Sequence, residues 1–274
     1  MAKFVLFTQN TMASIVATRE LLNKNHTKIK LIVMASQLKG DSLIDQVKVA
    51  RKLIKRSSLS FFTYKIIESK IHPLLLKYHK IFKTRKYKNG QASSIQDLAE
   101  QYNIPIIESS DLSNEEFLNH IATYKPDYVL CFVAQILRKK VFKILGDKII
   151  NTHGSYLPQY RGAAQYVWYL LNNDSHFGVT VHYIAPGLDT GDIVFQRKFP
   201  IQKNTSVYKL HYVLSKAFGI MMNEFIENYA EHHQRTKQDD SKATVTPMPS
   251  KEDMRELKKR NIKILPIKDF LKYI

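Results

Sequence analysis

Three polar residues of the kinds that catalyse group transfer stand at the ends of predicted elements of regular structure. Asn151 and His153 end an apolar run, and Asp189 lies in a Gly/Asp loop 38 residues after Asn151. An amide can donate to a developing oxyanion without titrating, and an imidazole can gain and lose a proton near neutral pH. A carboxylate can stabilise the protonated imidazole, or hold a water that carries the proton. Such groups can together stabilise a transient negative charge and move a proton.

Four short patterns surround these residues in a fixed order. They are Asn151-Thr152-His153, Ser155 to Gly162 (Ser-x-Leu-Pro-x-x-Arg-Gly), Gly178-Val179-Thr180, and Gly187 to Ile193 (Gly-x-Asp-Thr-Gly-Asp-Ile). In this combination the chain resembles the formyltransferase family, whose members use 10-formyltetrahydrofolate to formylate amines. The resemblance implies that Asn151, His153 and Asp189 are catalytic. It implies no metal, and the sequence shows no metal-ligand spacing.

The resemblance also implies residues that bind the two substrates. Those expected at the folate are Gln135, Ile136, Leu137, Gly187 and Leu188. Those expected at the amine substrate are Gln9, Asn10, Thr11, Arg161 and Thr180. Each set has a structural alternative: a strand-to-helix turn near Gln135, a helix N-cap at Thr11 and packing at Thr180. Ala185 stands where many relatives carry an acidic residue, so folate contacts there are expected to differ.

Alternating strand and helix patterns predict an α/β fold. Strands are expected over Lys3–Thr8, Ile29–Met34 and Asp127–Val133, with a helix over Met12–Leu22 between the first two. Strand-helix-strand units at this spacing predict a Rossmann-like, mostly parallel sheet flanked by helices. In such sheets ligands bind beyond the carboxyl ends of the strands.

Two further segments complete the predicted organisation. A catalytic domain is expected over 1–231 with a basic helical insertion at about 45–90, followed by a linker and short C-terminal appendage over 232–274. A long helix is expected from about Thr205 to Ala230 and a short charged helix near Lys251 to Arg260. The residues after Thr244 are too few for the C-terminal barrel that transfer-RNA formylating relatives carry.

The composition fits a packed protein without a membrane span. Of 274 residues, 44% are hydrophobic and 24% are charged, which argues against global disorder. No window is apolar enough to span a bilayer, and the N-terminus lacks a signal-peptide cleavage pattern. The one cysteine, Cys131, lies in an apolar run and is interpreted as a buried hydrophobic residue. A cytoplasmic location is expected.

The net charge of +18 is concentrated in two segments. Gln46 to Gly90 holds thirteen Lys or Arg and one acid, Glu68, and Lys251 to Ile274 holds eight basic and four acidic residues. The apolar residues of the first segment recur at helical spacing: Ile67, Ile71, Leu74, Tyr78 and Phe82. Pro73 is expected to open or kink that helix.

The basic insertion has three interpretations. One is a helical hairpin packed on the domain with its lysine face in solvent. The second is a contact with a partner protein or with the other subunit of a homodimer. The third is attachment to an anionic surface, either membrane lipid or a phosphate-bearing substrate. Nucleic acid is disfavoured because charge alone gives only nonspecific affinity.

The functional hypotheses differ mainly in the amine that receives the formyl group. The leading one is an N-formyltransferase that acts on a nucleotide- or lipid-linked amino sugar. The alternatives are a methionyl-tRNA formyltransferase-like enzyme without the barrel and a glycinamide ribonucleotide transformylase of the purine pathway. A folate-deformylating hydrolase and a binding module that retains the fold are disfavoured, the latter because Asn151, His153 and Asp189 are all present.

Overall fold

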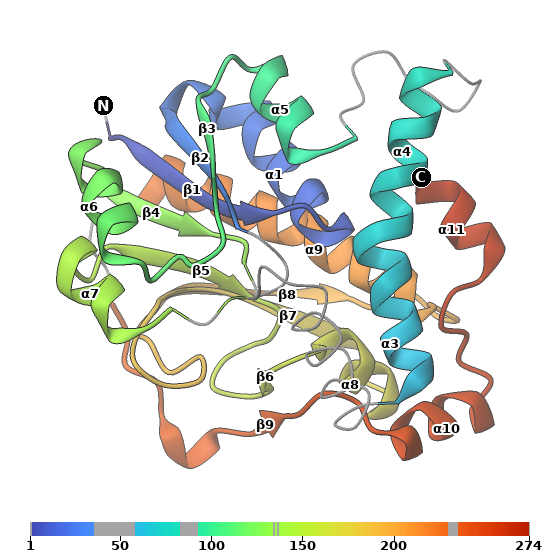
Figure 1. Ribbon diagram of the computed structural model, residues 1–274. Helices are drawn as coiled ribbons and strands as arrows, with labels where there is room; N and C mark the ends of the chain where they lie inside the picture. Colours follow the sequence, from blue (N-terminus) through green and yellow to red (C-terminus); the bar gives the residue numbers. More distant parts are fainter. Residues whose placement is uncertain are drawn as a thin grey trace.

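A seven-stranded sheet in the order β3-β2-β1-β4-β5-β7-β8 runs through the centre of the protein (Figure 1). The computed structural model describes residues 2–35, 58–82, 93–133, 135, 137–229 and 235–273. The strands are β1 (Phe4–Gln9), β2 (Ile29–Ala35), β3 (Ile106–Ser109), β4 (Tyr128–Cys131), β5 (Ile149–His153), β7 (His176–Tyr183) and β8 (Ile193–Pro200). The pairs from β3 through β5 are parallel, whereas β7 is antiparallel to both β5 and β8. The prediction of a mostly parallel sheet is confirmed.

Helices cover both faces of this sheet, as predicted. One face carries α1 (Met12–Asn25), α5 (Ile95–Gln101), α8 (Gln165–Leu171) and α9 (Val207–Glu224), and the other carries α6 (Glu115–Thr123) and α7 (Lys139–Leu145). Residues of β1 alternate between the two cores: Phe4 and Leu6 face α1 and α9, and Val5 and Phe7 face α6 and α7. Because both faces are buried, the central strands are apolar without alternation. None of the helices in the described ranges is long and apolar enough to cross a membrane.

The predicted element boundaries lie close to the observed ones. The strand expected over Lys3–Thr8 is β1, and the helix expected over Met12–Leu22 is α1, which runs three residues further to Asn25. The long helix expected from Thr205 to Ala230 is α9 continued by a π-helix, Phe225–Tyr229. Ser206 caps α9 by accepting a hydrogen bond from the Lys209 amide.

The part of the basic insertion that the structure describes is one long helical segment with a π-helix in its middle. It consists of α3 (Leu59–Ile66), the π-helix Ile67–Ile71 and α4 (His72–Ile81). Pro73 is the second residue of α4, and proline can neither donate its amide nor fit against the carbonyl four residues before it. The wider π turn ahead of it is the usual way in which a helix accommodates such a defect. Residues 45–57 and 83–90 of the predicted insertion lie outside the described residues.

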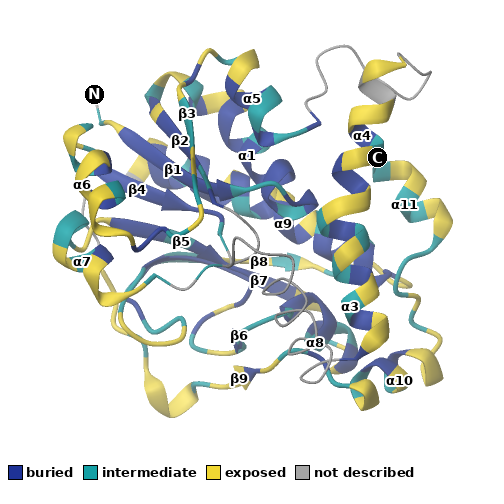
Figure 2. Cartoon of the chain, viewed as in Figure 1, coloured by how far each residue is buried: buried dark blue, intermediate teal, exposed yellow. Residues whose placement is uncertain are grey.

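The apolar stripe read from the sequence of this helix faces outward, which contradicts the one interpretation, of three, in which the lysine face is in solvent and the stripe packs on the domain. Ile71, Leu74, Tyr78 and Phe82 are 39%, 65%, 50% and 64% exposed, and Figure 2 shows the exposed side of α4. The face against the domain is built instead from Phe61, Tyr64, Glu68, His72 and Leu76. Three of those five residues are polar enough to look like surface, which is why hydropathy indicated the opposite face.

Glu68 is fully buried because it has partners on every side. Its Oε2 accepts a hydrogen bond from Lys65 Nζ at 2.7 Å, and its Oε1 accepts one from the Ala13 amide at 3.1 Å in the first turn of α1. Burial alone would raise the pKa of this carboxyl, but the adjacent Lys65 charge lowers it below its ordinary value. Nearby, the Tyr64 hydroxyl hydrogen-bonds His211 Nδ1 at 2.8 Å, and Tyr166 stacks on the His211 ring. The inserted helix is therefore held to α1, α8 and α9.

The C-terminal residues pack against the same domain. The short strand β6 (Arg161–Gly162) pairs with β9 (Val245–Thr246), and Met254 and Leu257 of α10 (Lys251–Lys259) enter the larger core. The backbone at 263–264 accepts hydrogen bonds from the start of α9. The last helix, α11 (Ile267–Tyr273), lies beside α4, and His72 Nε2 donates to the Tyr273 carbonyl at 2.9 Å (Figure 1).

Candidate active site

Asn151 and His153 lie at the carboxyl end of β5, where the fold predicts a ligand. The antiparallel register places Asn151 opposite His182 and His153 opposite Thr180. Alternate residues of a strand share a face, so all four side chains belong to the same side of the β5–β7 pair. The His153 side chain is 7% exposed. The two catalytic residues predicted on this strand are thus side by side.

Asp189 comes to the same place from the loop between β7 and β8. Its Oδ1 lies 3.5 Å from His153 Nδ1, and its Oδ2 accepts a hydrogen bond from the Gly162 amide at 2.8 Å. Asp189 has a φ of 53°, and Gly187 two residues earlier has a φ of 131°. A Cβ on Gly187 would lie 2.4 Å from Thr190 Oγ1, so the loop requires glycine there. The described geometry therefore brings the amide, imidazole and carboxylate together.

The hydrogen bonds of His153 settle which ring nitrogen carries the proton when the ring is neutral. Its Nε2 lies 2.9 Å from the Tyr160 carbonyl, an acceptor, so Nε2 must donate. Gln165 lies against the same nitrogen at 3.2 Å while its amide donates to the Gly162 carbonyl at 2.7 Å. Nδ1, on the Asp189 side, is therefore the nitrogen with a lone pair. This nitrogen can accept a proton and then carry a cation beside the carboxylate.

His182 is a member of this group that the sequence reasoning missed. Its Nε2 lies 3.2 Å from Asn151 Nδ2, and its Nδ1 lies 2.8 Å from the Tyr183 carbonyl. Burial lowers the pKa of His182 to about 4, so the ring is neutral at physiological pH, donating from Nδ1 and accepting at Nε2. It thereby orients the Asn151 amide. The period of two along the strand, counted from Thr180, was the signal that could have identified it.

Two buried neutral histidines are expected to make the fold less stable in acid. Burial lowers the pKa of His182 to about 4 and that of His211 to about 3, below the value of about 6.5 for an unfolded chain. The unfolded chain then binds protons that the folded protein does not. The free energy of unfolding should fall as the pH drops from about 6.5 toward 4, by up to about 1 kcal/mol per pH unit for each ring.

Urea unfolding between pH 7.5 and pH 5 tests this expectation. His211→Gln should lose part of the pH dependence, whereas His176→Gln, at an exposed position of β7, should keep all of it. An identical slope in wild type and His211→Gln would contradict the assignment of the neutral ring.

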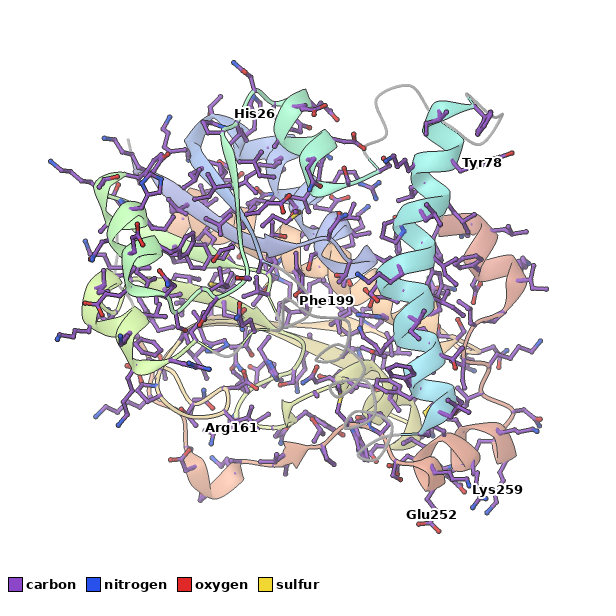
Figure 3. All side chains as sticks on the ribbon, viewed as in Figure 1. His26, Tyr78, Arg161, Phe199, Glu252 and Lys259 are labelled. Carbon is purple, nitrogen blue, oxygen red and sulfur yellow. The ribbon has the colours of Figure 1, made fainter. Side chains whose placement is uncertain are left out.

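Thr180, Ser155 and Arg161 hold the loops around the site. Thr180 Oγ1 donates to the Ser155 carbonyl at 2.6 Å and accepts from the Leu157 amide and Gln196 Nε2. The Arg161 guanidinium donates to Gln238 Oε1 at 2.7 Å and to Asp240 Oδ1 at 2.6 Å. Figure 3 labels Arg161 at the loops below the sheet. Thr180 and Arg161 were predicted to contact the amine substrate. The hydrogen bonds above use these two side chains to position the loops.

Gln238 is a second residue that the sequence did not single out. It lies in the stretch expected to be a linker, yet its Nε2 donates to the carbonyls of Asp189 and Gly191 at 2.8 and 2.7 Å. The Arg161–Gln238 pair therefore fixes the backbone that carries the Asp189 carboxylate. Nothing in the local sequence marks a glutamine in a polar run for this task.

The first loop, predicted at the amine substrate, has structural contacts of its own. Thr11 is the N-cap of α1 and accepts from the Ser14 amide, and Asn10 Oδ1 accepts from the Ile95 amide at 3.2 Å. Gln9 ends β1. The Ala13 amide, in the first turn of α1, donates to buried Glu68. The chain's own carboxylate therefore uses a helix terminus that would otherwise favour a bound anion.

The residues predicted at the folate include one buried polar atom that needs a donor. Gln135 Oε1, beyond the end of β4, has no hydrogen-bond partner within the described part of the chain. A pteridine carries several N–H groups, so its edge could satisfy this acceptor. Leu188 is 51% exposed beside Asp189, and Leu137 packs on the α6–α7 core. Ile136 lies outside the described residues. No group of three or more metal-binding side chains occurs among the described residues.

Comparison with known proteins points to one family. A family model described as "Formyl transferase" matches residues 3–226. The methionyl-tRNA formyltransferase of Geobacter sulfurreducens is 34% identical over 161 residues, which are 58% of this chain and 51% of that protein. The enzyme of the same name from Clostridioides difficile is 35% identical over 120 residues, covering 43% and 39%. The chain spans about half the length of the curated relatives it matches.

Solved structures share the fold at low identity. The sugar 3N-formyl transferase WlaRD, crystallised in the presence of dTDP and 5-N-formyl-THF, gives a TM-score of 0.55 at 20% identity over 92% of this chain and 71% of that chain. An N-formyltransferase from Helicobacter canadensis, in complex with folinic acid and dTDP-3-aminofucose, gives 0.55 at 18% over 92% and 72%. Glycinamide ribonucleotide transformylase 1 from Symbiobacterium toebii gives 0.57 at 13% over 87% and 95%.

Proposed function

Because the chain belongs to the formyl transferase family, we propose that it transfers the formyl group of 10-formyltetrahydrofolate to a primary amine. The observation that carries this proposal is the convergence of Asn151, His153 and Asp189, with His153 Nδ1 3.5 Å from Asp189 Oδ1. Their catalytic roles and the substrate contacts are part of the proposal. The buried acceptor of Gln135 and the exposed Leu188 support a folate edge at this end of the sheet.

The reaction requires the two substrates to be held together and one proton to be moved. The amine nitrogen forms a bond to the formyl carbon, the bond from that carbon to N10 breaks, and a proton passes from the amine to N10. The products are the N-formyl amine and tetrahydrofolate, so atoms balance without a further reactant. Positioning and oxyanion stabilisation are the two contributions that the protein can make.

Asn151 supplies the oxyanion donor. One N–H of its amide is directed to His182 Nε2, and a carboxamide has a second N–H to donate. This second N–H stabilises negative charge on the formyl oxygen during attack. Because His182 is neutral, it accepts from the amide and does not compete for the oxyanion as a donor.

His153 and Asp189 move the proton. With Nε2 bound to the Tyr160 carbonyl, His153 takes the amine proton at Nδ1 and returns it to the departing nitrogen. Asp189 stabilises the imidazolium formed in between, and the Gly162 amide holds the carboxylate through its other oxygen. A water that Asp189 holds beside His153, and not between two atoms 3.5 Å apart, is the alternative carrier of the proton.

For the acceptor we propose an amino sugar, linked to a nucleotide or a lipid. Two structural neighbours were crystallised with dTDP or dTDP-3-aminofucose, and each covers 92% of this chain. Methionyl-tRNA is the second candidate, because the curated relatives that match at 34% identity are methionyl-tRNA formyltransferases. The net charge of +18 would favour a phosphate-bearing substrate in either case.

A panel of acceptors tests the assignment through release of tetrahydrofolate from 10-formyltetrahydrofolate. The panel contains dTDP-linked amino sugars, methionyl-tRNA and glycinamide ribonucleotide, and the product is checked by mass for one added formyl group. We expect turnover with an amino-sugar nucleotide. Turnover with methionyl-tRNA alone would contradict the amino-sugar acceptor and support methionyl-tRNA as the acceptor. Folate release at the same rate with and without an amine would indicate hydrolysis and contradict formyl transfer.

A further inference from the structure

The described part of the chain gathers its exposed apolar side chains on one region. Of fourteen large apolar residues that are exposed, seven lie on α3, the π-helix, α4 and the residue after it, and two lie on neighbouring α11. The nine are Leu59, Ile66, Ile71, Leu74, Tyr78, Ile81, Phe82, Ile267 and Leu271. In the inserted helix most recur every three or four residues, so they form a stripe. Tyr78 projects from α4 in Figure 3. A patch of this kind marks an interaction surface.

The surface of this stripe carries positive charge without exposed negative charge. Lys70 and Lys77 are exposed among the apolar residues, and Lys268 and Lys272 are exposed on α11. The one acid between residues 58 and 82 is Glu68, which is fully buried and paired with Lys65. Asp269 of α11 accepts a hydrogen bond from Ser206. Exposed apolar residues interleaved with lysine are typical of helices that lie on anionic lipid.

A groove lies beside the stripe. It has a volume of about 1180 Å³ and lies between α3, α10 and residues 261–266. Apolar side chains line part of it, including Leu59, Ile67 and Met254. The hydroxyl side chains of Ser60 and Thr63 also line it. The groove therefore offers both apolar contact and hydrogen bonds.

Four basic side chains line this groove and no acidic one does. They are Lys251, Arg255 and Lys258 on α10, and Lys263 after it. The spacing of the three on α10 puts them on one face, and no ion pair forms with any of the four among the described residues. Two of the three acids of α10 are engaged elsewhere: Asp253 completes the capping box with Ser250, and Glu256 pairs with Lys259 and Arg260. The third, Glu252, is exposed and does not line the groove. The groove thus presents four unneutralised cations beside apolar side chains.

We propose that this face binds the surface of an anionic phospholipid membrane, with the stripe among the acyl chains and the groove at a phosphate headgroup. A second copy of the chain fits less well, because a symmetric contact would press the same basic surface against itself. Nucleic acid would use the cations but leave the exposed apolar stripe in water. The proposal does not depend on which amine is formylated.

Vesicle co-sedimentation of the full chain tests the proposal. We expect binding to phosphatidylcholine vesicles that contain about one third phosphatidylglycerol, and at least about tenfold weaker binding to phosphatidylcholine alone. Raising the salt from about 0.1 M to about 0.5 M should weaken the binding to the mixed vesicles. Arg255→Glu/Lys258→Glu and, separately, Leu74→Ser/Ile81→Ser should each reduce that binding at least about tenfold.

The controls make the same chemical changes elsewhere. Lys139→Glu/Lys143→Glu alters two exposed lysines of α7 on the other face of the sheet, and Val245→Ser alters an apolar residue that is 63% exposed. Neither should change vesicle binding, and all variants should keep wild-type turnover on a soluble amine. If the α7 variant lost as much vesicle binding as Arg255→Glu/Lys258→Glu, the net charge of the protein alone would explain the binding, and the proposal would be overturned. Binding of soluble glycerol 3-phosphate without vesicle binding, or self-association of the protein that Leu74→Ser/Ile81→Ser abolishes, would overturn it as well.

Discussion

Replacing His153 with alanine is expected to lower kcat by about 10² to 10⁴-fold, the usual contribution of a positioned general base. The ring is held at both ends, by the Tyr160 carbonyl at Nε2 and by Asp189 at Nδ1, so no neighbouring group can take its place. Single-turnover measurement of tetrahydrofolate formation with saturating amine reports the chemical step directly. KM should change much less than kcat, because the ring acts on the proton and not on substrate affinity.

Added imidazole separates loss of the base from loss of structure. The alanine variant leaves a space bounded by a carbonyl oxygen and a carboxylate, which are the partners that an imidazole molecule requires. We expect imidazole to restore part of the activity of His153→Ala and to leave wild type and His176→Ala unchanged. Turnover of His153→Ala near the wild-type rate would contradict the role of this ring.

Asn151, His153 and Asp189 are singled out through the resemblance to the formyltransferase family, and simple rules explain why the fold brings them together. Asn151 and His153 end a buried strand, and a mostly parallel sheet directs the carboxyl ends of its strands to the ligand. Asp189 lies in a loop whose glycines permit the positive φ values that the turn requires. The parallel order of the strands and the two helical layers follow from the same apolar patterns.

The supporting residues could not be predicted because their roles depend on contacts between distant segments. Gln238 and Arg161 are 77 residues apart, and they meet close to the point where β6 pairs with β9. The buried face of the inserted helix could not be predicted for a related reason. Glu68 of the π-helix is buried against the start of α1. Lys65 balances its charge and the Ala13 amide donates a hydrogen bond to it, but a hydropathy pattern shows neither contact. Hydropathy finds apolar contacts, but it does not find a charge whose burial is compensated.

A variant that keeps the shape of the site but removes its charge is Asp189→Asn. An asparagine can still accept the Gly162 amide through its oxygen and can donate its NH2 to the lone pair of His153 Nδ1. The folded structure should therefore persist, with a free energy of unfolding within about 1 kcal/mol of wild type. The imidazolium formed during proton transfer, however, would then lie beside a neutral amide. We expect kcat to fall by about 10³-fold, as when a preorganised electrostatic partner is removed.

The control for this variant is Asp147→Asn, which makes the same change at the opposite end of β5. Asp147 pairs with Arg235 and is 73% exposed, so its loss should leave turnover unchanged. If Asp189→Asn turned over amine at the wild-type rate, the carboxylate charge would be irrelevant, and Asp189 would only shape the loop around Gly162. A large loss of activity together with unfolding would indicate the same structural role. Aspartate and asparagine have the same shape and can make the same hydrogen bond to the Gly162 amide, but only aspartate is charged. Loss of kcat in a folded Asp189→Asn protein would therefore support a carboxylate whose charge acts on the reacting proton through His153.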